Sequence, residues 1–418
     1  MKWQNRRTKQ KQRHRPQKRI RTKYDKTDWR IRTMTETRRL YYEDVYRKEF
    51  QATVLECREA KKGYHILLDE SAFYPEGGGQ PSDIGYLGNV KVNEVHEKNG
   101  ELLHYTSEPL EAGTVVTGTI DWDRRFDLMQ QHSGEHMVSG LVHEAYGYDN
   151  VGFHMGSDVI TIDFNGMLDE KQLSEIEAKV NRKIWEDTEV EITYPTPEEL
   201  AVLPYRSKKE LTGKVRIVRF PGADICACCG THVTHTGEIG IVKLLSVEKF
   251  REGVRVEMIC GKRVLEYLNM VRTQNHQVSV QLSAKEGNTA EAVARLAEEN
   301  FRLKGRVLRL EEQLFTSEAE KWACIGNLTL FQEGMEADSV RKLADAVMQN
   351  CGGRCAVFSK NPDGSYKYAI GEKNGDLRQF VKEMNAALNG RGGGKPFFVQ
   401  GSVQASEEEI RKFFENRD

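Results

Sequence analysis

The 418-residue sequence lacks any long apolar run: no segment approaches the roughly 18 consecutive apolar residues that a membrane-spanning helix needs. No secretory signal pattern stands at its start either. Hydrophobic residues make up 38% of the chain and charged residues 30%, a balance typical of a soluble, rather polar globular protein. The length is sufficient for about two to four domains with cores of their own.

Cysteine is too irregularly spaced for a disulfide framework in a chain of this size. There are eight cysteines, and three of them, Cys226, Cys228 and Cys229, stand close to histidines. This pattern favours a reducing compartment and metal chemistry over disulfide bonds. We therefore expect a cytoplasmic protein.

The net charge of −1 hides an uneven distribution. Residues 1–33 contain fourteen Lys or Arg and two Asp, a net charge of +12, which leaves −13 for the rest of the chain. A basic arm of this kind could bind nucleic acid through counterion release, or serve as a mitochondrial targeting segment. We prefer a disordered leader, or a true start at Met34, because no apolar period occurs between Lys2 and Thr33.

Apolar patterning predicts an α+β protein. Residues 34–120 form short β-rich runs separated by glycine-rich turns. Residues 121–147 have the spacing of a helix with Gly147 as its C-cap, and residues 169–188 form an amphipathic helix. Strand-like runs on both sides of the cysteine cluster complete a mixed sheet.

After residue 261 the pattern becomes helical. Val293, Asn300, Val307 and Leu314 fall seven residues apart, and leucines occupy the interleaved positions 296, 303 and 310. This a/d heptad seam predicts either an intrachain hairpin with residues 262–283 or a parallel dimer, in which Asn300 at an a position would fix the pairing.

The last hundred residues alternate strand and helix, which predicts a small α/β domain with some parallel pairing. A glycine run beside a lysine follows in RGGGKPFFVQGS, residues 391–402. This run is either a structural loop or a contact to an RNA backbone, made by glycine N–H groups and two cations. The candidate RNA-binding residues are Arg391, Gly392, Gly393, Gly394 and Lys395.

The segment DICACCGTHVTHTGEIG, residues 224–240, admits two metal sites. Cys226 and Cys229 have the CxxC spacing of a structural zinc knuckle, whereas Cys228 and His232 have a CxxxH spacing that needs ligands from elsewhere. The predicted helix 121–147 supplies such ligands, because His132 and His136 are four residues apart and project from one face. These two histidines, Cys228 and His232 are donors of the type that zinc prefers.

The HxxxH pair followed by CxGTHVxxTGEIG resembles the editing domain of alanyl-tRNA synthetases and of their free-standing relatives. The resemblance extends upstream to FYPEGGGQPSDIG, residues 73–85, and to GFHMGSDVITIDF, residues 152–164, and downstream to RGGGKPFFVQG. It therefore covers nearly the whole chain from Met34. It favours Cys228 as the ligand and leaves Cys226 and Cys229 as supporting or spare thiols.

The resemblance implies a zinc-dependent hydrolase that deacylates tRNA(Ala) mischarged with serine or glycine. Zinc could then position the attacking water, polarise the ester carbonyl or hold the substrate. The alternative function, from a different class, is a nonenzymatic tRNA-binding protein with a structural zinc. The glycine run at residues 77–79 could also be a plain tight turn, which is the more common use of such runs. The substrate-binding residues that it implies are Gly77, Gly78, Gly79, Gln80, His154 and Thr231.

The domain order implied is a basic tail (1–33), a β-rich, barrel-like domain (34–120), a zinc editing domain (121–261), a helical or coiled-coil spacer (262–320) and an α/β tRNA-binding domain (321–418). The aminoacylation domain of the synthetase has no room in this chain, and neither a P-loop nor a DHH triplet occurs. We therefore expect no ATP use and no aminoacylation.

Overall fold

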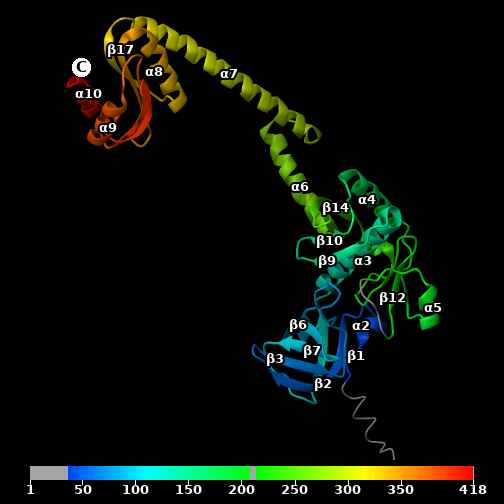
Figure 1. Cartoon of the computed structure of the whole chain (residues 1–418). Helices are drawn as coiled ribbons and strands as arrows, with labels where there is room; N and C mark the ends of the chain where they lie inside the picture. Colours follow the sequence, from blue (N-terminus) through cyan, green and yellow to red (C-terminus); the bar gives the residue numbers. More distant parts are fainter. Residues whose placement is uncertain (1–35, 208–212, 418) are drawn as a thin grey trace, which may run out of the picture. The chain divides into compact units, whose positions relative to one another are not determined.

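The computed structural model describes residues 36–207 and 213–417, and the chain divides into two compact units between Thr273 and Gln274 (Figure 1). Both units combine helices with sheets, which confirms the predicted α+β class. The five-segment division stays a prediction, and its basic tail lies outside the described residues. Within the described ranges, no helix is both long and apolar enough to cross a membrane.

Six antiparallel strands close into a barrel (Figure 1). Burial alternates along strands such as β6 (Val90–Lys98), so that alternate side chains point into the barrel. The core includes Phe50, Ile66, Leu68 and Phe73. In order around the barrel the strands are β2 (Glu49–Glu59), β3 (Tyr64–Leu68), β7 (Glu101–Thr106), β6, β5 (Gly85–Leu87) and β8 (Val115–Ile120); β1 (Arg38–Arg39) pairs with β4 (Glu70–Ser71), and α2 is Leu40–Glu43.

A buried histidine lies in this barrel. His104, which is 0% exposed, contacts the carbonyl oxygen of Ile66 through Nδ1 at 3.0 Å and Ser71 Oγ through Nε2 at 2.8 Å. Since a carbonyl only accepts, Nδ1 carries the proton and Nε2 accepts from the Ser71 hydroxyl. Burial lowers the pKa of His104 to about 4, because the charged form would lose its hydration.

An ion pair with no exposed surface joins the barrel to the next domain. Arg125 donates from Nε to both carboxylate oxygens of Asp83, at 2.9 and 3.0 Å, and from Nη2 to the Ala72 carbonyl at 2.7 Å. Asp83 also accepts from the backbone N–H of Tyr74 at 2.6 Å. Breaking such a pair would leave a buried charge uncompensated, so it favours a single arrangement of helix and barrel.

Arg125 belongs to the long helix α3 (Trp122–Tyr146), which begins and ends as predicted. Its N-cap Asp121 accepts from the backbone N–H of Arg124, and Gly147 ends it in the left-handed conformation at φ 70°. The apolar face packs in a core with α4 (Glu170–Trp185), whose predicted face of Leu173, Ile176, Val180 and Ile184 is buried.

Two antiparallel sheets complete the first unit. One has the order β14 (Val242–Phe250), β15 (Gly253–Cys260), β10 (Ile160–Phe164) and β9 (Asn150–Met155); the other has the order β11 (Glu191–Thr193), β12 (Ile217–Phe220) and β13 (Asp224–Ala227). The remaining helical segments are α5 (Pro197–Val202), the 3₁₀ turn η1 (Thr236–Ile239) and α6 (Lys262–Gln281), within which the two units divide.

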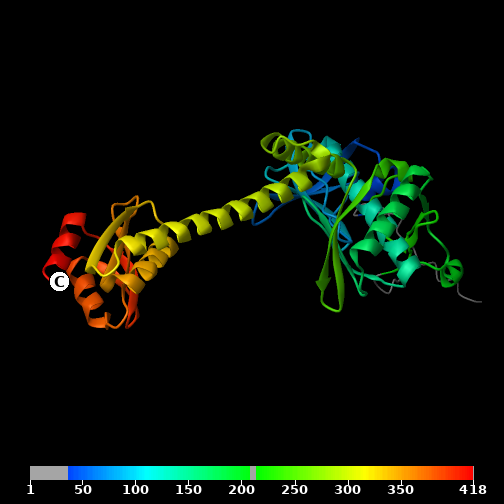
Figure 2. The same ribbon diagram turned by 90° about the horizontal axis from the view of Figure 1, so that it is seen from above.

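The second unit joins a 33-residue helix, α7 (Thr289–Lys321), to a five-stranded sheet (Figure 2). Phe315 and Ala319 near the end of α7 are buried in a core shared with α8. The strand order is β16 (Gly326–Glu333), β17 (Gly352–Lys360), β18 (Tyr366–Glu372), β20 (Phe398–Val403) and β19 (Gly390–Lys395), with only β16 and β17 parallel among these strands; the other helical segments are η2 (Glu286–Asn288), α8 (Ala337–Cys351), α9 (Arg378–Ala387) and α10 (Glu407–Glu415).

The buried neutral His104 predicts that the fold weakens in mild acid. The pKa of His104 in the folded state lies below the unfolded value of 6.5. Its contribution to the free energy of unfolding, up to about 3 kcal/mol, is therefore complete above pH 6.5 and is lost as the pH falls through about 4. Urea unfolding at pH 7.5 and 4.5 should show that the free energy of unfolding falls less between these pH values in His104→Gln than in wild type. The exposed His143→Gln is the control, and an unchanged pH slope in His104→Gln would contradict the assignment.

Candidate metal centre

Four side chains from two parts of the chain converge beside α3. The helix contributes His132 and His136, one turn apart with ring centroids separated by 5.2 Å, and the loop after β13 contributes Cys228 and His232. One ligand atom from each of the four lies within 4.8 Å of the others, and Cys228 Sγ is 3.5 Å from His132 Nε2. Three imidazole nitrogens and one thiolate form a donor set suited to tetrahedral zinc.

Three of the six histidine nitrogens in this cluster are buried without a hydrogen-bond partner among the described residues. Each of the three histidines is at most 2% exposed, and His136 Nε2 and both ring nitrogens of His232 have no partner among the described residues. Unpaired buried polar atoms are costly and rare. A cation held by the four side chains would give a partner to His136 Nε2 and to one nitrogen of His232, so the residues present match the group that the spacing predicts.

The electrostatics of the cluster favour the ligand forms of Cys228 and His232, whereas His136 differs: burial opposes its charged form, but the neighbouring Cys228 and Asp224 raise its pKa well above the usual value. Burial disfavours the thiolate of Cys228, but the surrounding His132, His232 and His136 outweigh burial and lower the pKa of this thiol well below its usual value. Burial lowers the pKa of His232 to about 3, which keeps its imidazole neutral. A thiolate and a neutral imidazole are the forms that bind metals.

Gln80 orients one of the ligands. Its Oε1 lies 2.8 Å from His132 Nδ1 and accepts from the Thr231 backbone N–H at 3.1 Å, while its Nε2 donates to Thr231 Oγ1 at 2.7 Å. The backbone donor identifies the amide oxygen, so His132 Nδ1 carries the proton and Nε2 faces the cluster. Gln80 and Thr231 are only 0% and 1% exposed and contact each other, and substrate contact by these two residues stays a prediction.

The glycine run serves a tight turn. Gly77 and Gln80 exchange backbone hydrogen bonds at 3.1 and 3.0 Å, and Gly78 and Gly79 between them have φ of 63° and 86°. A Cβ at Gly79 would lie 2.7 Å from Phe153, whose ring stacks on His132 with centroids 5.6 Å apart. The turn therefore places Gln80 and leaves room for Phe153; substrate contact by the glycines stays a prediction.

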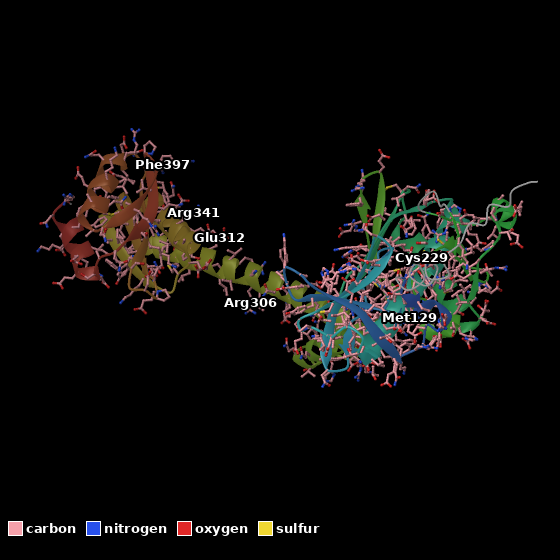
Figure 3. The ribbon with its side chains drawn as sticks, turned by 90° about the horizontal axis from the view of Figure 1, so that it is seen from below. Met129, Cys229, Arg306, Glu312, Arg341 and Phe397 are labelled. Atoms are coloured by element: carbon pink, nitrogen blue, oxygen red, sulfur yellow. The ribbon has the colours of Figure 1, made fainter. Side chains whose placement is uncertain are left out.

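The remaining candidate residues are not among the four donors of the cluster. His154 follows Phe153 in β9 and is exposed, so the two side chains point to opposite faces of the strand; substrate contact by His154 stays a prediction. Cys226 is buried near His136 and Asp224, and Cys229 is exposed (Figure 3). The candidate RNA-binding residues 391–395 form the edge strand β19 of the second unit, where a loop was the alternative.

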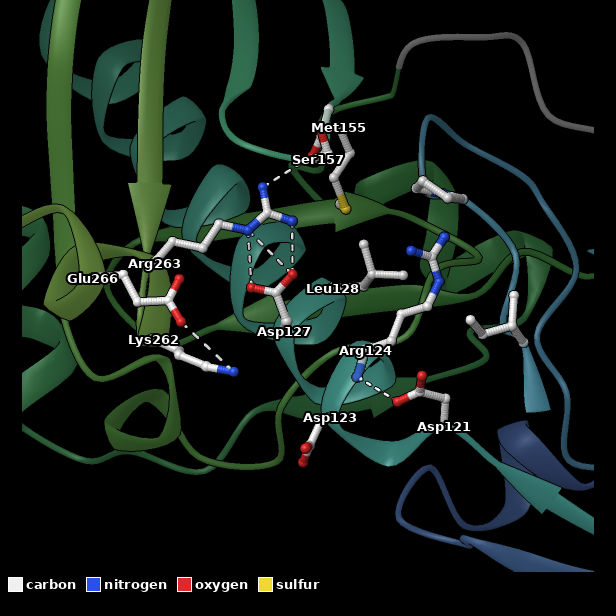
Figure 4. Close-up of a pocket in the computed structure, with 13 residues that line it drawn as sticks. Asp121, Asp123, Arg124, Asp127, Leu128, Met155, Ser157, Lys262, Arg263 and Glu266 are labelled. Carbon is white, nitrogen blue, oxygen red and sulfur yellow. Dashed lines mark hydrogen bonds and ion pairs between the residues drawn. The ribbon is translucent and has the colours of Figure 1, made fainter.

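A pocket of about 570 Å³ opens beside the first turns of α3 (Figure 4). Arg263 makes an ion pair with Asp127 in it at 2.7 Å. Four carboxylates and three cations line the pocket, so its charge does not favour phosphate, and none of its lining residues is a candidate metal ligand. The lining residues are Pro81, Ile84, Asp121, Asp123, Arg124, Asp127, Leu128, Met155, Gly156, Ser157, Lys262, Arg263 and Glu266.

Three family models match the chain. The model of the threonyl and alanyl tRNA synthetase second additional domain matches residues 215–256, which include Cys228 and His232. The model of class II (A) tRNA synthetases matches residues 1–124, and the DHHA1 domain matches residues 323–417.

Curated relatives match over most of this length. Alanyl-tRNA editing protein AlaX-L of Pyrococcus horikoshii is 29% identical over 89% of this chain and 96% of its own length. Alanyl-tRNA editing protein Aarsd1-A of Xenopus laevis is 31% identical over 67% of this chain and 72% of its own length. The alanine–tRNA ligase of Halorubrum lacusprofundi is 32% identical over 90% of this chain, which spans only 43% of the ligase.

With this cluster of donors and these relatives, the chain belongs to the family of alanyl-tRNA editing proteins. Among solved structures, the C-Ala domain of Aquifex aeolicus alanyl-tRNA synthetase matches 22% of this chain at 23% identity and covers 92% of its own length. The TM-score of 0.20 is too low for a comparison of folds.

The cluster predicts that Cys228 binds the metal and that Cys226 does not. Elemental analysis should find about one zinc per wild-type chain and a loss of that zinc in Cys228→Ala, because removing one of four ligands opens a tetrahedral site. Cys226→Ala and the exposed Cys229→Ala should keep it. Loss in Cys226→Ala with retention in Cys228→Ala would move the site to the CxxC pair.

Proposed function

We propose that this chain is a zinc-dependent hydrolase that deacylates mischarged tRNA(Ala), an editing reaction in trans. The observation that carries the proposal is the convergence of His132, His136, Cys228 and His232 in a member of the editing family, where buried nitrogens of His136 and His232 have no partner among the described residues. An ester of an amino acid with the terminal ribose is already activated. The site therefore needs to orient the ester and a water more than to supply strong chemistry.

The protein itself supplies orientation and a dry environment. Of the four donors only Cys228 is partly exposed, so a substrate must approach from the side of the cysteine loop. Gly230 in that loop lies against His132, since a Cβ there would come within 2.1 Å of the ring carbon Cε1. Packing of this kind holds the imidazole rigid while the ester binds. Zinc, when bound, would polarise the carbonyl, position water or hold the amino group or ribose.

Serine and glycine are the amino acids that need this reaction. A synthetase pocket for alanine discriminates only modestly against a substrate with one carbon fewer or one hydroxyl more, so a separate hydrolytic site is required. Because Gln80 and Thr231 satisfy each other, a preference for serine would need another donor or acceptor beside the cluster.

The proposed reaction predicts rapid hydrolysis of Ser-tRNA(Ala), Gly-tRNA(Ala) or both, with Ala-tRNA(Ala) spared. Cys228→Ala should slow hydrolysis by about 100-fold or more, because a metal contributes several kcal/mol to transition-state stabilisation. Release of labelled amino acid from the three substrates measures the rates, and Cys229→Ala is the matched control. Wild type that binds tRNA but hydrolyses none of the three would support the nonenzymatic alternative.

We assign contact with the tRNA body to the sheet of the second unit. The strand β19 pairs with β20 on one side only, and Arg391, Lys395 and the three glycines between them are exposed. Phe397 beside them is 44% exposed (Figure 3). The glycines of β19 allow a sugar–phosphate backbone to approach closely, and the two cations and the aromatic ring beside them can contact phosphates and bases.

We further propose that α7 pairs with a second copy of the chain. Every apolar member of the a/d seam is roughly half exposed, from 47% for Leu303 to 55% for Leu314, so the seam is not covered within the described chain. Charged residues such as Arg306 and Glu312 project from the same helix (Figure 3). A heptad seam with flanking charges and one polar a position is typical of a parallel two-stranded coiled coil.

Pairing through α7 predicts a dimer that seam charges disrupt. Sedimentation should give a dimer for wild type and a monomer for the double variant Leu303→Glu, Leu310→Glu, because the charges would have to be buried against each other. Phe301→Glu is the control, since Phe301 is 81% exposed but lies off the seam. A monomeric wild type, or a dimeric double variant, would contradict the proposal.

A further inference from the structure

His136 has a charged partner on the side away from the metal cluster. Its Nδ1 lies 2.8 Å from Asp224 Oδ2, and the two side chains are only 3% and 2% exposed. A carboxylate only accepts hydrogen bonds, so Nδ1 carries the proton. In the neutral ring Nε2 then keeps its lone pair; it has no hydrogen-bond partner among the described residues and lies beside the other three donors.

Asp224 is itself held by Arg206. The guanidinium donates from Nε to Oδ1 and from Nη2 to Oδ2, both at 2.8 Å, which is the two-point geometry that fixes a carboxylate in one orientation. The Arg206 side chain is 15% exposed. Its backbone is fixed as well, because Arg206 N–H donates to the Ile225 carbonyl and its own carbonyl accepts from Ala227 N–H.

A close approach of helix and strand makes this contact possible. Gly140 lies one turn after His136 in α3, and a Cβ at Gly140 would come within 2.1 Å of the Ala223 carbonyl oxygen and 2.6 Å of Asp224 Cβ. Only a glycine allows α3 to lie this near to β13. The contacts Arg206–Asp224 and Asp224–His136 therefore connect a fixed backbone segment to the candidate ligand.

We propose that Asp224, fixed by Arg206, is a positioning residue for His136 and strengthens its bond to the metal. The carboxylate fixes the tautomer and the ring orientation, and its negative charge makes Nε2 a stronger donor. His132 instead has the neutral partner Gln80, so the two histidines on α3 differ as ligands. The inference rests on the proposed zinc site and not on any substrate.

The same residues do not form a second metal site. A carboxylate oxygen of Asp224, a nitrogen of His136 and Cys226 Sγ lie within 4.8 Å of one another, as ligands of one ion would. Arg206, however, contacts both carboxylate oxygens, and its positive charge opposes a cation at that point. We therefore assign Asp224 to orientation of the first site.

Chelator competition and cobalt spectroscopy on the full-length chain test the proposal. Asp224→Asn retains an acceptor but loses the charge, and it should bind zinc about 10- to 100-fold more weakly. Its cobalt-substituted form should show shifted d–d bands, which a purely structural residue would not alter. Arg206→Lys keeps the positive charge but loses the two-point contact, so its zinc affinity should lie between those of Asp224→Asn and wild type.

A matched ion pair in the same unit serves as the control. Arg255 contacts Asp163 at 2.7 and 2.8 Å between β15 and β10, so Asp163→Asn breaks a similar two-point pair and should leave affinity and spectrum unchanged. Wild-type affinity and spectrum in Asp224→Asn would overturn the proposal. If that variant does not fold, unchanged values in Arg206→Lys would overturn it. Wild type without zinc would refute the metal site itself, whereas two zinc ions per chain in Arg206→Lys would indicate a second site.

Discussion

The candidate site depends on how closely α3 approaches the loop that carries Cys228 and His232. The two histidines of the helix supply half of a tetrahedral donor set, and only the loop supplies the other half. Two glycines allow this approach: Gly140 against Ala223 and Asp224, and Gly230 against His132. A methyl group at Gly140 would push α3 away from the start of β13, and one at Gly230 would displace the ring of His132 itself.

The four donors could be predicted from sequence because ligand spacing is a local property of a helix and a loop. His132 and His136 follow from the helical repeat, and Cys228 with His232 follows from a motif within five residues. The barrel, by contrast, required knowledge of how its six strands pair around a closed circle. Short β-rich runs indicate strands, but they do not give their order.

The supporting residues were harder to predict. Gln80 is 52 positions from His132 in sequence and Arg206 is 70 positions from His136, so no local pattern connects them. Asp224 stands in the same short segment as the cysteines, and its carboxylate four residues before Cys228 was the signal that could have found it. Substrate contact by His154 stays a prediction, and the alternation of β9 turns its side chain away from the His132 ring on which Phe153 stacks.

Gln80 comes from the loop between the short strand β4 and the barrel strand β5, yet it contacts a ligand on α3. The barrel and the metal centre therefore depend on each other and should be inherited together, although each has a hydrophobic core of its own. A recombination event that moved the histidine and cysteine motifs into another protein without the barrel would leave His132 without the partner that sets its tautomer. Gene fusions and fissions in such a family should accordingly preserve the junction near residue 120 and break the chain elsewhere.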